Sequence, residues 1–331
     1  MKKILSIVTM ALLVSACVAG GTGGGGNTGE VVKVDTPAAF KETKDVVIGG
    51  FTVGFDVDKT DSVKAGGGLM GSGFGGKSVA KSKLTGVSDS VMQQITDAAY
   101  KDFVSKLKAQ GYTVVDRAQL MADAKFKDTK TYPSPYEDTA GGALGGGTKT
   151  KYFAPSSFGG LKVFLGDIQG VTGGIGFSNP GSAAAEYAKS AGVAVIHASF
   201  KVDFANSEKY GGFHTQSSSI SVDQGVAVNP VFTRLGIIKG WGGTFSKEIG
   251  VMTLNHTLTS DKQFAQISDV TSGAYKATQV VTNVVGVLGG IGSNNSTLYE
   301  FKANPQAFKE AASEALEEAS GVFVTKMVNL K

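Results

Sequence analysis

SDSVMQQITDAAYKDFVSKLKAQGYTVVD, residues 88–116, carries the clearest structural pattern in the chain. Its apolar side chains recur at every fourth position and fall on one face of a helix; they are Val91, Ile95, Ala99, Phe103 and Leu107. Ser88 has the hydroxyl of an N-cap residue, and Gly111 suits the position where a helix ends. Tyr112–Asp116 has the valine-rich composition of a short strand. These residues predict a helix that leads into a strand.

The neighbouring segments extend this pattern. Upstream, residues 46–58 place apolar side chains at alternate positions, which is typical of a strand; these are Phe51, Val53, Phe55 and Val57. A glycine-rich break follows at Gly66–Gly76. Downstream, Arg117–Ala124 resembles the start of a second helix. The first third of the chain is therefore predicted to contain a strand, a helix, a strand and a helix.

The remainder of the chain predicts more strands and a closing helix. Residues 125–190, with their prolines and a glycine run at 141–147, are expected to form a long irregular insertion, with a short strand at 161–165. Strands are predicted at 193–204, 217–228, 235–238 and 249–258. Asn304 and Pro305 begin an alanine-rich helix. We therefore expect an α+β fold: a mixed sheet with packed helices, a βαβ-type core, and long Gly-rich insertions that include β-hairpins.

The N-terminus has the features of an export signal. Lys2 and Lys3 precede an apolar run at Ile4–Val14, which is shorter than the roughly 20 residues that span a bilayer. The sequence Leu13-Val14-Ser15-Ala16-Cys17 resembles the lipobox of bacterial lipoproteins. That resemblance implies that Cys17 receives a diacylglycerol thioether, becomes the first residue and is then N-acylated. Cys17 is the only cysteine, so no disulfide can form.

This resemblance also implies a location and three regions. Position 18 is Val rather than Asp, which in lipoprotein sorting favours the outer membrane. We assign residues 1–16 to a signal peptide and 17–30 to the lipidated cysteine and a flexible Gly-rich tether. Residues 31–331 are the folded domain, with its insertion at about 125–190, and we expect this domain to face the periplasm.

Composition excludes several classes of function. The net charge is only +4 and no dense basic cluster exists, so we expect no nucleic-acid partner. Beyond the N-terminus, no run of 18 apolar residues predicts a membrane-spanning helix. Glycine, at 47 of 331 residues, is roughly double its usual frequency.

Two glycine-rich stretches imitate nucleotide-binding motifs. Gly71–Gly76 fits G-x-G-x-x-G, but that site needs a helix directly after the turn, and the next helix begins near Ser88. Gly142–Lys149 resembles a phosphate-binding loop, but Thr148 precedes Lys149, which is the wrong order. We interpret both stretches as loops and predict no cofactor.

The histidines suggest no catalytic or metal site. His197, His214 and His256 are too far apart for a helical zinc pair, and Cys17 is assigned to lipid, so we predict no metal. A Ser-His-Asp triad stays open because its members need not be close in sequence. No G-x-S-x-G motif is present. We expect a non-enzymatic protein with no catalytic residues, and a packed or surface-facing imidazole is the preferred interpretation of His197.

Two further segments raise the question of membrane-inserted hairpins. Leu161–Phe177 and Val226–Leu254 mix alternating apolar residues with glycine, and the second contains Trp241, the only tryptophan. One chain has too few such strands to close a pore, but a ring of subunits could do so if each donated a hairpin. The alternative interpretation, hairpins of a water-exposed sheet, is slightly favoured because the alternation is often interrupted.

The block from Ser88 to Asp123 resembles the curli-secretion-channel (CsgG-like) lipoprotein family, in its helix, its glycine and YTVVDRAQLMAD. VAVIHASFKVDF (193–204) resembles the next strand of that family, and the helix from Asn304 its closing helix. The stretch between 124 and 193 is longer than in that family, and its pore-forming region is not recognisable.

The resemblance implies a non-enzymatic outer-membrane lipoprotein that forms a homo-oligomeric ring or channel component of a secretion or envelope assembly. Its partners would be the membrane, through acylated Cys17, and a secreted cargo or another envelope protein. The alternative is a monomeric, tethered periplasmic regulator, similar to the lipoproteins that activate peptidoglycan synthases. An envelope hydrolase is the third hypothesis.

Overall fold

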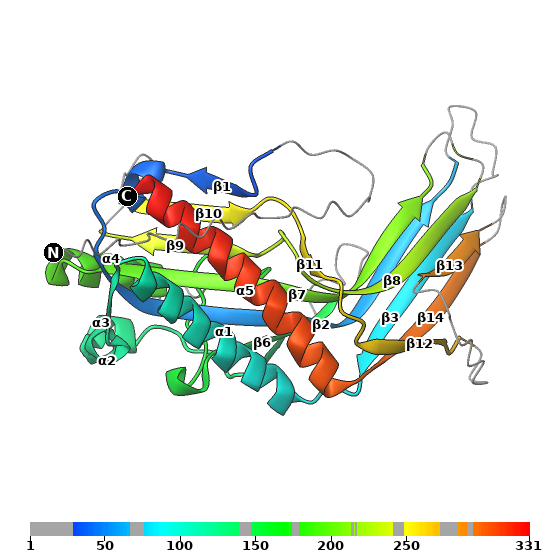
Figure 1. Cartoon of the computed structure of the whole chain (residues 1–331), viewed down its shortest axis with the longest axis horizontal. Helices are drawn as coiled ribbons and strands as arrows, with labels where there is room; N and C mark the ends of the chain where they lie inside the picture. The colour runs from blue at the N-terminus through cyan, green and yellow to red at the C-terminus, as the bar shows by residue number, and fades with distance from the viewer. Residues whose placement is uncertain are drawn as a thin grey trace, which may run out of the picture.

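The computed structural model describes residues 29–66, 76–138, 147–171, 173, 179–212, 215, 217–240, 248–271, 284–289 (backbone only) and 294–331. It has an α+β fold with a mixed sheet, as predicted (Figure 1). The strands are β1 (Val32–Asp35), β2 (Asp45–Lys64), β3 (Lys77–Thr85), β4 (Thr113–Val115), β5 (Tyr136–Asp138), β6 (Lys149–Phe153), β7 (Ala194–Tyr210), β8 (Ser218–Val228), β9 (Arg234–Ile238), β10 (Ile249–Leu254), β11 (Leu258–Ser260), β12 (Ala265–Asp269), β13 (Val284–Gly289) and β14 (Asn294–Ala303). The helices are α1 (Asp89–Ala109), α2 (Arg117–Ala122), α3 (Ala124–Lys127), α4 (Pro180–Ala191) and α5 (Pro305–Leu330).

The centre of the sheet is the parallel pair β2 and β7, which is in register from Val46 opposite Ala194 to Phe55 opposite Val202. The main path of the sheet runs β1-β10-β9-β7-β2-β3-β14-β12. β4 and β6 also pair with β2, and β8 also pairs with β7. Because β2 and β7 have buried residues on both faces, helices must cover the sheet on both sides.

α1 and α5 cover one face of the sheet (Figure 1). Phe51 of β2 contacts Phe103 of α1, and Phe200 of β7 contacts Phe323 of α5, with ring centroids 5.7 and 6.0 Å apart. The predicted caps of α1 are present: Ser88 Oγ accepts from the amide of Val91, and Gly111 has a φ of 82°. The 26-residue helix α5 begins at the predicted Asn304 cap.

The opposite face is covered by α2, α3 and α4. Val47 and Val195 point to this side and pack with Leu120, Phe126 and the alanines of α4. Residues 125–190 were expected from the sequence to be irregular, and this prediction is wrong for their described part. They supply most of α3, the strands β5 and β6, and most of α4. The predicted strand at 161–165 is absent; Leu161 forms only an isolated bridge to Tyr132.

Beyond the helices, strands project as an arm (Figure 1). We define the arm as β2 from residue 58, β7 from residue 203, and β3, β8, β13 and β14. In one layer β3 lies between β2 and β14 and pairs with both, and in the facing layer β8 pairs with β7 and β13. Ser78 Oγ of β3 lies 2.9 Å from Ser218 Oγ of β8 and joins the two layers.

The interior of the arm combines small polar side chains of β3 with apolar ones, including the ring pair of Phe204 and Phe301. Its exterior is polar along β3 and β8, whereas Tyr210 and Leu298 are exposed on β7 and β14. Ser78, Ala80 and Ser82 of β3 are buried, whereas Lys81 and Lys83 alternate with them and are exposed. Ile220 and Val222 of β8 also point inward, between the half-buried Ser219, Ser221 and Asp223. A membrane-inserted hairpin needs an apolar outer face, and the described side chains of β3 and β8 supply none.

The hairpins that project are not the two segments suggested by the sequence. Val226–Leu254 contributes the end of β8 and the strands β9 and β10, whose Leu235, Ile237 and Met252 are buried in the core. In the described part of Leu161–Phe177, Leu161, Val163 and Phe164 are buried as well. Trp241 and Phe177 lie outside the described residues. The suggestion of membrane hairpins at these two segments is therefore wrong for their described parts.

Candidate functional site: the neck cluster and the His197 pocket

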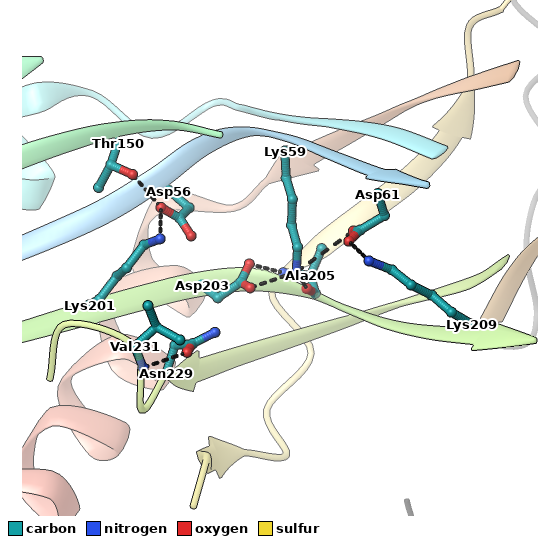
Figure 2. Close-up of polar contacts among 10 residues, drawn as sticks. All are labelled: Asp56, Lys59, Asp61, Thr150, Lys201, Asp203, Ala205, Lys209, Asn229 and Val231. Atoms are coloured by element: carbon teal, nitrogen blue, oxygen red, sulfur yellow. Dashed lines mark hydrogen bonds and ion pairs between the residues drawn. The ribbon is translucent and has the colours of Figure 1, made fainter. Parts of the chain in front are cut away.

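At the base of the arm, β2 and β7 stop pairing with each other. β2 turns to β3 from Asp58 onward, and β7 turns to β8 from Val202 onward. The two strands meet again at the arm tip, where Ala65 bridges Gly212. Charged side chains fill the gap between them, and we call this set the neck cluster (Figure 2): Asp56, Lys59, Asp61, Lys201, Asp203 and Lys209.

Lys59 is the central member of the neck cluster. Its ammonium donates to Asp203 Oδ2 and to the carbonyl of Ala205, both at 2.6 Å, and lies 3.9 Å from Asp61 Oδ2. Burial disfavours the charged form, but the ion pairs, led by that with Asp203, outweigh it and raise the pKa of Lys59. Asp203 also accepts from the amide of Ala205, at a bulge between β7 and β8. Lys59 thus fixes β2 to β7 where their backbone pairing ends.

Asp56 occupies the core side of the cluster and is only 3% exposed. Its carboxyl accepts a hydrogen bond from Thr150 Oγ1 at 2.6 Å, and Lys201 Nζ is 3.4 Å away. Burial raises the pKa of Asp56 to about 7, although Lys201 acts in the opposite direction. Near neutral pH this carboxyl therefore exists in both protonation states.

The outer side of the cluster is formed by Asp61 and Lys209, whose charged atoms are 2.7 Å apart. The loop after β8 is held against β7, because the backbone amide of Asn229 donates to the carbonyl of Lys201 at 2.8 Å. Asn229 also accepts from the amide of Val231 (Figure 2). Each charge in the cluster has an opposite partner, so the arrangement suits a fixed joint better than a catalytic group.

The second site is a cavity of about 360 Å³ on the α4 side of the sheet, which we call the His197 pocket. His197 is 5% exposed, its Nδ1 lies 3.0 Å from Asp167 Oδ1, and its ring stacks on Phe164 at 4.3 Å. Asp167 therefore fixes the proton on Nδ1 and leaves Nε2 as an acceptor when the ring is neutral. Within the described ranges no hydroxyl is hydrogen-bonded to Nε2. Of the two environments left open for His197, packed or surface-facing, the structure shows the packed one.

Arginine occurs only at positions 117 and 234, and both guanidinium groups are unusual. The Nε of each is buried without a hydrogen-bond partner. Arg117 lies over the ring of Phe158 at 4.0 Å, and burial lowers its pKa to about 10. Arg234 lines the His197 pocket, and no described residue forms a hydrogen bond or ion pair with its side chain. An unpaired buried donor costs about 1–3 kcal/mol, so both positions need an explanation.

The other residues singled out from the sequence are not brought together. His256 lies in a different environment from His197: its Nε2 is 3.1 Å from the carbonyl oxygen of Gly29. Cys17, His214 and most of both glycine motifs lie outside the described residues. Lys149, from the second motif, pairs with Glu137 at 2.8 Å. The neck cluster and Arg234 were missed by the sequence reasoning, since isolated Lys, Asp and Arg residues carry no spacing signal.

Searches of the described residues add two negative findings. No group of three or more His, Cys, Asp or Glu side chains there could hold a metal ion. None of the helices in those ranges is long and apolar enough to cross a bilayer. No known protein family, curated protein or solved structure matches this chain.

Substitution Lys59→Gln should lower the free energy of unfolding by about 3–5 kcal/mol, because Asp203 would stay buried without its cation. The matched control is Lys326→Gln, which breaks a pair with Glu30, a side chain that is 74% exposed. Such a surface pair contributes less than about 1 kcal/mol. Urea denaturation of both variants checks this, and equal losses would contradict the role of the neck cluster.

Asp56→Asn should change how stability depends on pH. The pKa of folded Asp56, about 7, lies above its ordinary value of 3.8, so between these values the folded state binds a proton that the unfolded state has lost. The stability contributed by this group is therefore lost as pH rises toward 7. Relative to wild type, Asp56→Asn should gain about 2–3 kcal/mol between pH 5 and pH 8 in urea denaturation. A constant difference across that range would refute the assignment.

Proposed function

We propose that this protein is a non-enzymatic, lipid-anchored protein of the outer membrane that forms an oligomeric ring or channel component of a secretion or envelope assembly. The arm is the element through which it contacts its neighbours. The observation that carries this proposal is that the arm projects from a core already covered by helices on both faces (Figure 1). A projecting element with a fixed direction is suited to making the same contact in every subunit.

The neck cluster supports this role. Lys59 and its partners hold β2 and β7 at a set distance just where their backbone hydrogen bonds end. The serine pair Ser78 and Ser218 holds the two layers of the arm together. Closed ring assembly requires one repeated angle between subunits, and a rigid joint at the base of the arm satisfies that requirement.

The anchor is proposed to be Cys17, with the following glycine-rich residues as its tether. Residues 17–29 can reach at most about 40 Å when extended. The chain enters the fold beside β10: Gly29 accepts from His256, and the amide of Asn255 donates to the carbonyl of Val31 at 2.8 Å. Lys326, near the end of α5, pairs with Glu30 at 2.9 Å. The first and last elements are thereby tied together where the tether arrives, and the core is held near the lipid.

The polar exterior of the arm favours a second candidate, a monomeric, tethered regulator that binds another envelope protein. Lys81 and Lys83 are exposed and give β3 a charged outer face that is stable in water. In that case the arm would be the surface that meets the partner protein, and no ring would form.

The ring and the regulator are separated by the native mass of the mature protein. This mass is measured on the detergent-extracted protein, with particle images taken from the same sample. We expect a discrete multimer with a central opening. The double variant Lys81→Glu, Lys83→Glu should shift the protein toward monomer, because it reverses the charge of the arm exterior, whereas Lys101→Glu on the exposed side of α1 should not. A wild-type protein that is strictly monomeric would rule out the ring and leave the regulator.

Cys17→Ala should release the protein from the membrane fraction, because only a thiol forms the lipid thioether. Cell fractionation and the mass of the N-terminal peptide check this, with Val18→Ala as the control that keeps the thiol. A Cys17→Ala protein that still sediments with the outer membrane would mean that the folded domain is itself the anchor.

A further inference from the structure

The His197 pocket contains a charge that no described residue neutralises. Arg234 supplies a guanidinium group with no described hydrogen-bond or ion-pair partner, and its Nε is buried. None of the side chains that line the pocket is a carboxylate. Asp167, the carboxylate that holds His197, is 1% exposed and accepts from His197 Nδ1 and from the backbone amide of Phe164. A pocket with a fixed cation and no anion suits a negatively charged ligand.

Two glycines clear the space for these polar groups. A side chain at Gly166 would begin 1.6 Å from Arg234 Nη1, and the φ of Gly166 is 88°. A side chain at Gly236, the residue that pairs with His197 across the sheet, would begin 1.9 Å from His197 Nε2. The guanidinium and the imidazole therefore occupy positions that only glycine permits. Both groups reach the cavity because two separate backbone segments lack side chains there.

Asn179 and Ser182, at the start of α4, add polar groups to the pocket wall, and the side opposite them is apolar. Ile238, Ile249 and Val251 come from the adjacent strands and line the cavity beside the stacked Phe164. Leu165 also lines it, and 69% of this side chain is exposed. An exposed leucine at the mouth of an apolar pocket gains contacts when an apolar group enters. The volume of about 360 Å³ is at the lower end of small-molecule sites.

We propose that the His197 pocket binds a small amphiphilic oxyanion, namely a carboxylate or phosphate monoester with a short apolar tail. The oxygens accept from Arg234, whose planar fork matches either group. The tail lies along Ile238, Ile249 and Val251 and under Leu165. His197, held by Asp167, fixes one wall of the pocket. This inference does not depend on the proposed ring or on the lipid anchor.

The test uses hexanoate as the probe and the full mature chain in detergent. Because the chain has only two arginines, a nitrogen-15 spectrum contains two Nε–Hε signals, and Arg117→Lys assigns them. Hexanoate should shift the Arg234 signal saturably, with a dissociation constant of about 1 mM or tighter, which is ordinary for a ligand of this size. Acetate, which lacks the tail, and hexanamide, which lacks the charge, should each bind at least about tenfold more weakly. Hexyl phosphate is the second anionic probe, and the tighter of the two anions identifies the head group.

Arg234→Gln lacks the reporting signal, so its binding is measured by isothermal titration calorimetry alongside wild type. This variant should lose saturable binding of both anions, whereas Arg117→Gln, which alters the other arginine, should keep it unchanged. Leu165→Ser should weaken hexanoate about threefold and leave acetate unaffected. This second variant changes an exposed side chain, so it stays informative if Arg234→Gln does not fold. The proposal is overturned if neither hexanoate nor hexyl phosphate shifts Arg234 saturably, or if hexanoate binds Arg234→Gln or Leu165→Ser as it binds wild type.

Discussion

The ion pair between Lys59 and Asp203 is the interaction on which the rest of the architecture depends. Up to Phe55 and Val202, backbone hydrogen bonds pair β2 with β7. Beyond that point the same strands belong to two different layers, and Lys59 provides their connection at the neck. Buried ion pairs rarely add much net stability, but breaking one is costly, so they specify a geometry. Here the geometry specified is the direction of the arm relative to the helical core.

The arm also explains why small and polar residues were retained inside a sheet. A wide apolar core would push its layers apart, whereas Ser78, Ala80 and Ser82 let β3 approach β8 closely enough for a serine hydroxyl contact. In contrast, the core face under α1 and α5 is dominated by aromatic rings, including Phe51, Phe103 and Phe200.

Sequence patterns predicted the elements that bury wide apolar faces and missed those that do not. α1, α5 and the first part of β7 were predicted because their apolar residues repeat with the period of a helix or as a continuous buried run. β3 was missed because its inward residues are mostly Ser and Ala, which give no hydrophobic alternation. α4 was missed because its alanine-rich sequence follows a glycine-rich stretch. The site partners, such as Lys59 with Asp203 or Asp167 with His197, are too distant in the chain for any spacing rule to join them.

If the chain is anchored through Cys17 as proposed, the attachment of the tether at β1 has a mechanical consequence. Any pull between the membrane and the protein enters the fold through β1, which pairs with β10 over only four residues, from Val32 to Asp35. The ion pair of Glu30 with Lys326 shares that load with the last helix, but it lies at the surface and is weak. Under tension β1 would yield first and lengthen the tether by its own extended length, while β2, β7 and the helices that cover them remain folded. In the proposed arrangement, the edge strand β1 would therefore detach before the core unfolds when the membrane moves.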